Sequence, residues 1–335
     1  MEGKHFRRGL GWPANGASHD GGAARSPGGD APPGPGSCTG HPTEPGRIHL
    51  CSDRRSCPAL SSGPLGAGRS EVTLSEPLED IEGVLLNLDG TIFVGDRLVP
   101  GAADAVDALR RAGLSLRFGT NTTRMSRTAL VSRLQTMGLE LEPGEVFTAP
   151  LSAAAWLEKK GLWNLSLCVP EAAHADFGHF KINETSPQAV VIGDLGEAWD
   201  FTRLNDSFRH IMEGAEFVAL QRNRYWHTGE GLSLDAGTFV AALEYATERE
   251  ATLAGKPSPM FFQGAAESMG VELFNLAVVG DDPGADVAGA HDCDAAAILV
   301  KTGRFQGGAL TRSMPRPDLI LDSVAALPAA LGVGF

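Results

Sequence analysis

The sequence predicts an α/β protein: a core built on a doubly wound, Rossmann-like parallel sheet, with a smaller α/β domain inserted into it. From about residue 80 onward, short apolar runs typical of buried strands alternate with segments of helical spacing. Such alternation favours a parallel sheet with helices on both faces. A second alternating block separates the two halves of the core, so we place the inserted domain at residues 148–250 and the core at residues 80–147 and 251–335.

The first half of the core contains two predicted strands and two predicted helices. The strand Val84–Leu88 is an apolar run that ends at Asp89 and Gly90, a pair common in turns. The segment Ala102–Ala112 has apolar residues at helical spacing, and Leu114–Gly119 indicates the next strand. Ser126–Met137 is the second helix, because Ser126 is a good N-terminal cap and a glycine follows the last residue.

The second half of the core and the inserted domain repeat this order of elements. In the core we predict the strand Ala251–Gly255, the helix Ser258–Met269, the strand Leu276–Gly280, the helix Asp286–Asp292 and the strand Ala296–Val300. In the inserted domain we predict strands at Leu165–Val169, Ala189–Ile192 and Phe217–Leu220, and helices at Phe201–Met212 and Thr238–Thr247. Both blocks therefore suit a parallel sheet covered by helices.

Composition limits the classes of function. The chain has 335 residues, of which 42% are hydrophobic and 21% charged, which suits a globular protein with a sizeable core. Its formal net charge of -13 argues against nucleic acid as a partner, because phosphate backbones require clustered Lys and Arg. The sequence contains no apolar run of roughly eighteen residues, so we expect no membrane span and predict a cytoplasmic protein.

Residues 1–75 are predicted to form a disordered tail. Residues 1–70 contain fifteen Gly and nine Pro, and such a stretch cannot bury enough apolar area to offset the entropy of the chain. A mitochondrial transit peptide is the alternative. Arg7, Arg8 and Arg25 favour it, whereas the Gly and Pro content and the absence of an amphipathic helical pattern oppose it.

The cysteines do not indicate a metal site. The chain has five, none of them in a CxxC pair, so we expect neither a zinc site nor a disulfide framework. Cys168 and Cys293 lie in apolar segments and are predicted to be small buried hydrophobes in a reducing compartment. His227 and His291 are expected at the surface or in packing, because no second histidine has the spacing of a metal site.

Polar side chains lie at the carboxyl ends of four predicted strands. They are Asn87 and Asp89, Thr120 and Asn121, Lys256, and Asp281 and Asp282. In open parallel sheets, ligands bind beyond the carboxyl ends of the strands. We therefore expect these groups, distant in sequence, to converge on one site.

Four short motifs give the chain a resemblance to a known family. They are Phe118–Thr123, Ala241–Thr247, Gly255–Ser258 and Val279–Asp282. Each is weak alone, but together they are similar to the haloacid dehalogenase superfamily, in the phosphatase branch that carries a large α/β cap. Within it, the chain resembles the subgroup of phospholysine phosphohistidine inorganic pyrophosphate phosphatase and its haloacid dehalogenase-like hydrolase domain-containing relatives. The resemblance covers residues 80–335.

The resemblance implies a covalent phosphatase mechanism with Mg²⁺ as cofactor. The first carboxylate of the family attacks phosphorus, and Asn87 stands at its position. Asp89 is then the acid that protonates the leaving oxygen and later activates water. Thr120, Asn121 and Lys256 bind the phosphoryl group. A small phosphorylated molecule is the implied substrate, and a homodimer is one assembly that caps of this branch form.

The implied metal site also uses these strand ends. Mg²⁺ lies among Asn87, the backbone carbonyl of Asp89 and Asp281. Asp282 and Asp286 hold metal-bound waters or orient Lys256. The resemblance also implies a cap that covers the substrate and contacts it through Asn223, Arg224 and Asp235.

Each of these residues also has a structural alternative. Asp89 fits a simple Asp-Gly turn, and the acids at 281, 282 and 286 fit turns and a helix N-terminus. Thr120 and Asn121 suit the cap of the following helix. In the inserted domain, the segment around Asn223 and Arg224 suits a solvated hairpin, and Asp235 suits the cap of the helix that follows it.

The amide at position 87 leaves three hypotheses for the function of the protein. An amide is neutral and weakly nucleophilic, so the leading hypothesis is a phosphatase-family pseudoenzyme that binds a phosphoryl group and Mg²⁺ with impaired hydrolysis. The second is an active Mg²⁺-dependent phosphatase for phosphoesters, phosphoamidates or pyrophosphate, in which Asp89 activates water or Asn87 is deamidated. The third is a non-catalytic interaction module with a vestigial pocket.

Overall fold

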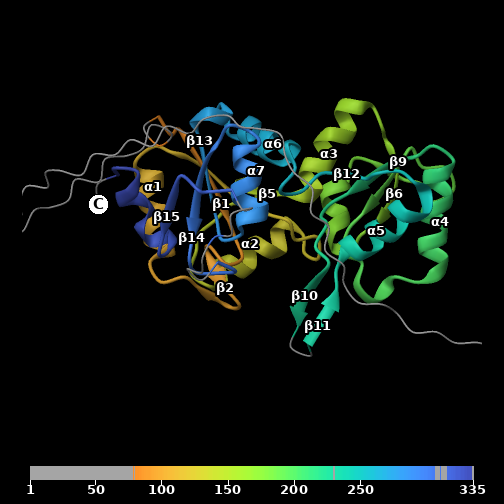
Figure 1. The fold of residues 1–335 in the computed structure, drawn as a ribbon, viewed down its shortest axis with the longest axis horizontal. Coiled ribbons are helices and arrows are strands. Elements are labelled where there is room, and N and C mark those ends of the chain that lie inside the picture. The colour runs from red at the N-terminus through yellow and green to blue at the C-terminus, as the bar shows by residue number, and fades with distance from the viewer. Residues whose placement is uncertain (1–77, 79, 229–230, 306–309, 311–314, 334–335) are drawn as a thin grey trace, which may run out of the picture. The chain divides into compact units, whose positions relative to one another are not determined.

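Two parallel β-sheets, each with helices on both faces, organise the chain in a computed structural model (Figure 1). The structure describes residues 78, 80–228, 231–305, 310 and 315–333. The predicted tail at residues 1–75 lies outside these residues. Within the described part of the chain, we find no helix with the length and apolar character that a membrane crossing requires.

The first sheet has six strands in the order β15-β14-β13-β1-β4-β5, and all neighbouring pairs are parallel. The strands are β1 (Gly83–Asn87), β4 (Ser115–Thr120), β5 (Val146–Thr148), β13 (Leu276–Gly280), β14 (Ala296–Val300) and β15 (Leu319–Leu321). The order reverses beside β1, from which the chain continues to one edge and later to the other. The prediction of a doubly wound parallel sheet is confirmed.

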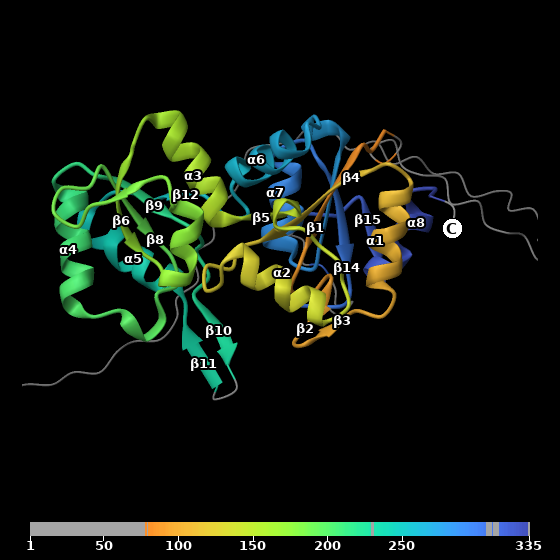
Figure 2. The same cartoon turned by 180° about the vertical axis from the view of Figure 1, so that it is seen from behind.

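Alternate residues of these strands face two separate hydrophobic layers. Val84 and Leu86 of β1 pack in the layer covered by α1 (Ala102–Arg111), α2 (Arg127–Thr136) and α8 (Leu327–Ala330). Leu85 points the other way, into the layer covered by α6 (Pro259–Met269) and α7 (Ala288–His291) (Figures 1 and 2). Each large apolar side chain buried in this way contributes about 1.5–3 kcal/mol to folding. Burial on both faces explains why the strands are continuous apolar runs.

The chain leaves the first sheet after β5 and forms a second parallel sheet in the order β12-β9-β8-β6-β7. Its strands are β6 (Asn164–Cys168), β7 (Lys181–Ile182), β8 (Ala189–Ile192), β9 (Glu216–Ala219) and β12 (Thr252–Leu253). The helix α3 (Ala149–Lys160) and the 3₁₀ segment Glu171–Phe177 cover one face. The helices α4 (Phe201–Met212) and α5 (Ala236–Thr247) cover the other. We call residues 149–253 the inserted region.

Shorter elements complete the described chain. Two antiparallel pairs are present: β2 (Phe93–Val94) with β3 (Arg97–Leu98), and β10 (Tyr225–Thr228) with β11 (Gly231–Leu234), as Figure 2 shows. The remaining helical turns are Pro143–Glu145, Gly196–Ala198, Leu273–Asn275, Pro283–Val287 and Val324–Ala326.

Most predicted elements are confirmed within one or two residues. Four have the predicted bounds, namely β8, β13, β14 and α4. Ser126 caps α2, because its Oγ accepts a hydrogen bond from the Ala129 N–H at 3.2 Å. Cys168 and Cys293 are buried free thiols, and burial raises the pKa of each to about 11. Both therefore remain protonated near neutral pH, as small hydrophobes should.

One strand was predicted in the wrong sheet. The segment Ala251–Gly255 was expected in the core, but its extended part is Thr252–Leu253, which pairs with Val218 and Ala219 of β9. The apolar pattern indicates a buried strand without indicating which sheet receives it. The helix predicted at Asp286–Asp292 also begins earlier, at Pro283, because the Asp282 carboxylate accepts from the N–H groups of the first turn.

Candidate active site

Three neighbouring strands of the first sheet bring polar residues to one edge. β1 ends at Asn87, β4 ends at Thr120, and β13 is followed directly by Asp281. The parallel register pairs Leu86 with Val279 and Asn87 with Gly119, so these three ends lie side by side. Lys256 arrives from the segment between β12 and α6. Asn87 hydrogen-bonds both Asp281 and Lys256, so the structure brings these three distant residues together.

The Asn87 amide lies at the centre of this cluster. Its Nδ2 donates to the backbone carbonyl of Asp89 at 2.8 Å and to Oδ1 of Asp281 at 2.8 Å. Its Oδ1 accepts from the ammonium of Lys256 at 2.8 Å. These partners determine which end of the amide faces which neighbour, because a donor faces two acceptors and an acceptor faces a donor.

Lys256 and Asp286 form a buried ion pair beside Asn87. Lys256 Nζ donates to Asp286 Oδ1 at 2.7 Å, and the two residues are only 7% and 1% exposed. The second carboxylate oxygen of Asp286 accepts from the Asp282 N–H at 3.1 Å. A buried charge needs such a partner, because desolvation alone costs several kcal/mol per ion. Asp286 is therefore the charged partner that holds the Lys256 ammonium in place.

Asp281 is held by contacts on both carboxylate oxygens. Oδ1 accepts from Asn87, and Oδ2 accepts from the Arg304 N–H at 2.7 Å. Burial raises the pKa of Asp281, and the charge of Asp286 adds to the rise. Gly90 packs against this carboxylate: with φ at 83°, a Cβ there would lie 2.3 Å from Oδ2. Only glycine permits so close an approach at this turn.

Asp89 and Asp282 face the surface of the same cluster. Asp89 is exposed, and it lies in the Asp-Gly turn that the sequence offered as its structural alternative. Asp282 Oδ2 accepts from Arg304 at 2.7 Å, while its Oδ1 caps the turn at Pro283. Burial alone would lower the pKa of Arg304, but the carboxylates of Asp282, Asp281 and Asp89 outweigh it and raise that pKa. Arg304 was not predicted, because nothing near it in sequence marks it.

Thr120 and Asn121 occupy different positions relative to Lys256. Thr120 is buried at the end of β4, and its Oγ1 accepts from the Thr122 N–H at 3.1 Å. Asn121 contacts the main chain of Lys256 twice: Nδ2 donates to the carbonyl at 2.9 Å, and Oδ1 accepts from the N–H at 2.8 Å. These contacts make Asn121 a residue that positions Lys256, and its contact with phosphate stays a prediction.

Three predicted residues of the inserted region lie around the start of α5. The Asn223 carbonyl accepts from the Gly237 N–H at 2.9 Å, and the Arg224 carbonyl accepts from the Asp235 N–H at 3.1 Å. The Asp235 carboxylate accepts from the Ala236 N–H at 2.7 Å, and burial raises its pKa. Asp235 is thus a helix cap, as its alternative held. Among the described residues, no hydrogen bond joins these three to the Asn87 cluster.

Sequence reasoning missed a contact between the first sheet and the inserted region. The guanidinium of Arg124, four residues beyond Thr120, donates through Nε and one terminal nitrogen to the two oxygens of Asp194. It also lies over the ring of Trp226, 4.0 Å from the centroid. The Asp194 N–H donates to Thr123 Oγ1 at 2.9 Å. Spacing could not reveal this contact, because its partners are distant in sequence.

Replacing Arg124 by alanine is expected to cost about 1–3 kcal/mol of unfolding free energy. The change leaves the Asp194 side chain, which is 9% exposed, without its charged partner and removes the stacking on Trp226. Urea unfolding followed by circular dichroism measures the loss. The control is Arg209→Ala, whose pair with Asp206 is 64% and 51% exposed and should contribute less than about 0.5 kcal/mol. Equal losses in the two variants would refute the expectation.

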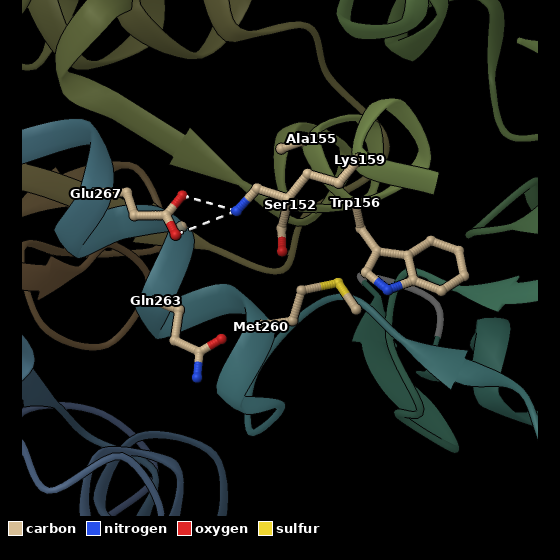
Figure 3. Close-up of a pocket in the computed structure, with 8 residues that line it drawn as sticks. Ser152, Ala155, Trp156, Lys159, Met260, Gln263 and Glu267 are labelled. Atoms are coloured by element: carbon tan, nitrogen blue, oxygen red, sulfur yellow. Dashed lines mark hydrogen bonds and ion pairs between the residues drawn. The ribbon is translucent and has the colours of Figure 1, made fainter. Parts of the chain in front are cut away.

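A separate hollow of about 280 Å³ lies between α3 and α6 (Figure 3). Trp156, Met260 and Gln263 line it, and the Lys159 ammonium bonds both oxygens of Glu267 across it, at 3.1 and 3.0 Å. It contains none of the predicted site residues. The chemistry of the strand ends is therefore independent of this hollow.

Comparison with known proteins agrees with this geometry. A model described as a haloacid dehalogenase-like hydrolase matches residues 84–175, and a HAD-hydrolase-like model matches residues 253–327. Together they contain all the residues of the Asn87 cluster.

Curated relatives cover most of the chain. The human haloacid dehalogenase-like hydrolase domain-containing protein 2 is 38% identical over 72% of this chain and 93% of its own length. Phospholysine phosphohistidine inorganic pyrophosphate phosphatase of Rattus norvegicus is 36% identical over 75% and 94%. The solved 4-nitrophenylphosphatase of Thermotoga maritima superposes with a TM-score of 0.71, at 28% identity over 77% of this chain and 100% of its own. The chain therefore belongs to the haloacid dehalogenase-like hydrolase family.

Proposed function

We propose that this protein binds a phosphoryl group at the ends of β1, β4 and β13 and hydrolyses it slowly or not at all. The observation that carries the proposal is the Asn87 amide at the end of β1, the position that the sequence resemblance gives to the attacking carboxylate. Lys256 Nζ lies 2.8 Å from its oxygen. Lys256 and Thr120 supply the groups that suit a phosphoryl anion, a charge and a hydroxyl. Asp89 is exposed beside them and is the group suited to protonate a leaving oxygen.

Impaired hydrolysis follows from the chemistry of the amide. A carboxylate attacks phosphorus as an anion and forms an acyl phosphate as the P–O bond to the leaving alcohol breaks, whereas a carboxamide oxygen is neutral and already accepts from Lys256. Loss of an attacking nucleophile costs on the order of 10⁶ in kcat in serine hydrolases. Binding needs only the charge and the hydrogen-bond donors, so it survives the change.

The observed donor set does not fit Mg²⁺. The expected protein ligands, Asn87, the Asp89 carbonyl and Asp281, do meet, but the amide nitrogen faces the two oxygens. Mg²⁺ is bound by oxygen atoms in an octahedron, and an N–H donor cannot serve as a ligand. In the described part of the chain, no three acidic, His or Cys side chains are grouped so that they could together hold a metal ion.

We further propose that the inserted region is the cap of the family. The sequence division at residues 148–250 extends naturally to Leu253, because β12 pairs with β9. In that case, Asn223, Arg224 and Asp235 are the residues through which the cap would contact the substrate. A cytoplasmic location and a homodimer remain predictions from the sequence.

An active phosphatase is the second candidate, and the relatives favour it. Phosphatase is part of the names of the Rattus norvegicus and Thermotoga maritima proteins, both of which this chain covers almost entirely. Asp89 is exposed, and the resemblance gives it the acid-base role, so Asp89 would be the residue that activates water.

The test measures binding and turnover in the same preparation. Inorganic phosphate should raise the melting temperature, because a ligand at 100 times its Kd stabilises the native state by about 2.7 kcal/mol. Thr120→Val, which removes one hydroxyl and keeps the shape, should weaken that response. Turnover of p-nitrophenyl phosphate should fall far below the usual kcat range of roughly 1–10³ s⁻¹. Turnover within that range supports the active phosphatase, and no response to phosphate supports the interaction module.

A further inference from the structure

We propose that the Asn87 amide takes the place of the divalent cation in this pocket, so that the wild-type protein neither needs nor binds Mg²⁺ there. The inference rests on the proposed function, since both take Asn87 as the counterpart of the attacking carboxylate. It adds that a single change, Asn87→Asp, creates a magnesium site. The distances around the amide, its fixed orientation and the charge of the cluster carry this inference.

Both hydrogens of the amide already point at the oxygens a cation would use. Nδ2 lies 2.8 Å from the Asp89 carbonyl and 2.8 Å from Asp281 Oδ1. An amide nitrogen has two donors, and these two contacts use both. The partial positive charge of the NH₂ group thus satisfies the same two acceptors that would otherwise need a metal ion.

Lys256 prevents the amide from turning over. Its ammonium donates to Asn87 Oδ1 at 2.8 Å, and it is fixed in turn by Asp286 at 2.7 Å. Rotating the amide by 180° would present a metal-facing oxygen, but it would also place the NH₂ group against the ammonium, donor against donor. A carboxylate has acceptors on both oxygens, so aspartate could face Lys256 and a cation at once. The amide has one acceptor end and one donor end, and the buried Lys256 ammonium fixes the orientation in which the oxygen faces it.

The charges around residue 87 also support the inference. Asp281 accepts from the amide nitrogen through Oδ1, and its other oxygen accepts from the Arg304 N–H at 2.7 Å. With aspartate at position 87, two carboxylate oxygens would meet at about the separation that Nδ2 now has from Asp281. Like charges so close disfavour ionisation of both, unless a cation lies between them. The amide removes that repulsion and with it the requirement for metal.

The response of the melting temperature to Mg²⁺ therefore distinguishes asparagine from aspartate at position 87. The wild-type melting temperature should be the same in EDTA and in millimolar Mg²⁺. Asn87→Asp should melt several degrees below wild type in EDTA and regain stability in Mg²⁺, because the ion binds only the native state. Titration calorimetry should give magnesium binding at least ~100-fold tighter for Asn87→Asp than for wild type. The matched control is Asn205→Asp on α4, which adds the same charge away from the cluster and should follow wild type.

A second variant separates blocking by the amide from mere lack of charge. Asn87→Ala frees the Asp89 carbonyl and Asp281 without adding a carboxylate. We expect it to bind Mg²⁺ more tightly than wild type and more weakly than Asn87→Asp. Magnesium stabilisation of wild type equal to that of Asn87→Asp would overturn the inference, as would Asn87→Ala no better than wild type. Turnover of p-nitrophenyl phosphate is scored separately: magnesium binding without turnover sinks only this inference, whereas turnover by wild type at the family rate sinks the proposed function.

Discussion

Asn87→Asp is expected to raise the rate of p-nitrophenyl phosphate hydrolysis in Mg²⁺ by at least about a thousandfold. The change restores an anionic oxygen at the end of β1, beside the Lys256 ammonium and near exposed Asp89. A thousandfold corresponds to about 4 kcal/mol of barrier, which is modest for a nucleophile. Release of p-nitrophenol at saturating substrate, with and without EDTA, measures the effect.

Two controls guard this experiment. Asn205→Asp adds the same group on α4 and should leave the rate at the wild-type level. Mass analysis of the wild-type peptide that contains residue 87 shows whether deamidation has already produced aspartate. If the variant hydrolyses no faster than wild type and the peptide is intact, then Lys256, Asp89 and Asp281 are not a usable phosphatase site.

Lys256→Met is expected to lower the unfolding free energy by about 3–5 kcal/mol. Methionine keeps the length of the side chain but leaves the Asp286 carboxylate, which is 1% exposed, without its charged partner. The Asn87 oxygen loses its donor as well. Chemical unfolding followed by tryptophan fluorescence measures the change.

The control for Lys256→Met is the same substitution at a surface pair. Lys301 bonds Asp322 at 2.7 Å, but these side chains are 41% and 90% exposed, so Lys301→Met should cost less than about 1 kcal/mol. Adding Asp286→Asn to Lys256→Met should recover part of the loss, since no bare charge is then left buried. If Lys256→Met and Lys301→Met unfold alike, the buried pair does not stabilise the fold.

Periodicity predicted the elements well where burial on both faces forces an apolar run. Leu276–Gly280 and Ala296–Val300 were found with their observed bounds because each residue in them is buried. The helix α3 was missed, since the apolar residues of Ala149–Lys160 are only weakly confined to one side of the helix. The sheet that receives β12 depends on tertiary pairing, which no local pattern encodes.

The candidate site was predictable in its strand-end residues and not in their partners. Asn87 ends β1 and Asp281 follows the neighbouring strand β13, so topology brings these two together, whereas Lys256 follows a strand of the second sheet and reaches them through tertiary contacts. The role of Asn121 could not be foreseen, because its two contacts are with the main chain of a residue 135 positions away. Arg124 and Arg304 were missed for the same reason: their carboxylate partners, Asp194 and Asp282, are distant in the chain.

The return path from the second sheet has a mechanical consequence. β12 ends at Leu253, and Asn121 hydrogen-bonds both main-chain polar groups of Lys256. Only Ala254 and Gly255 therefore separate these two fixed residues. Gly255 is confined as well: a Cβ there would lie 2.3 Å from the Leu220 carbonyl oxygen. Any movement of the inserted region relative to the first sheet must therefore be absorbed by these two residues or transmitted to Lys256, so the proposed cap and the proposed phosphate-binding ammonium are joined by a very short connection.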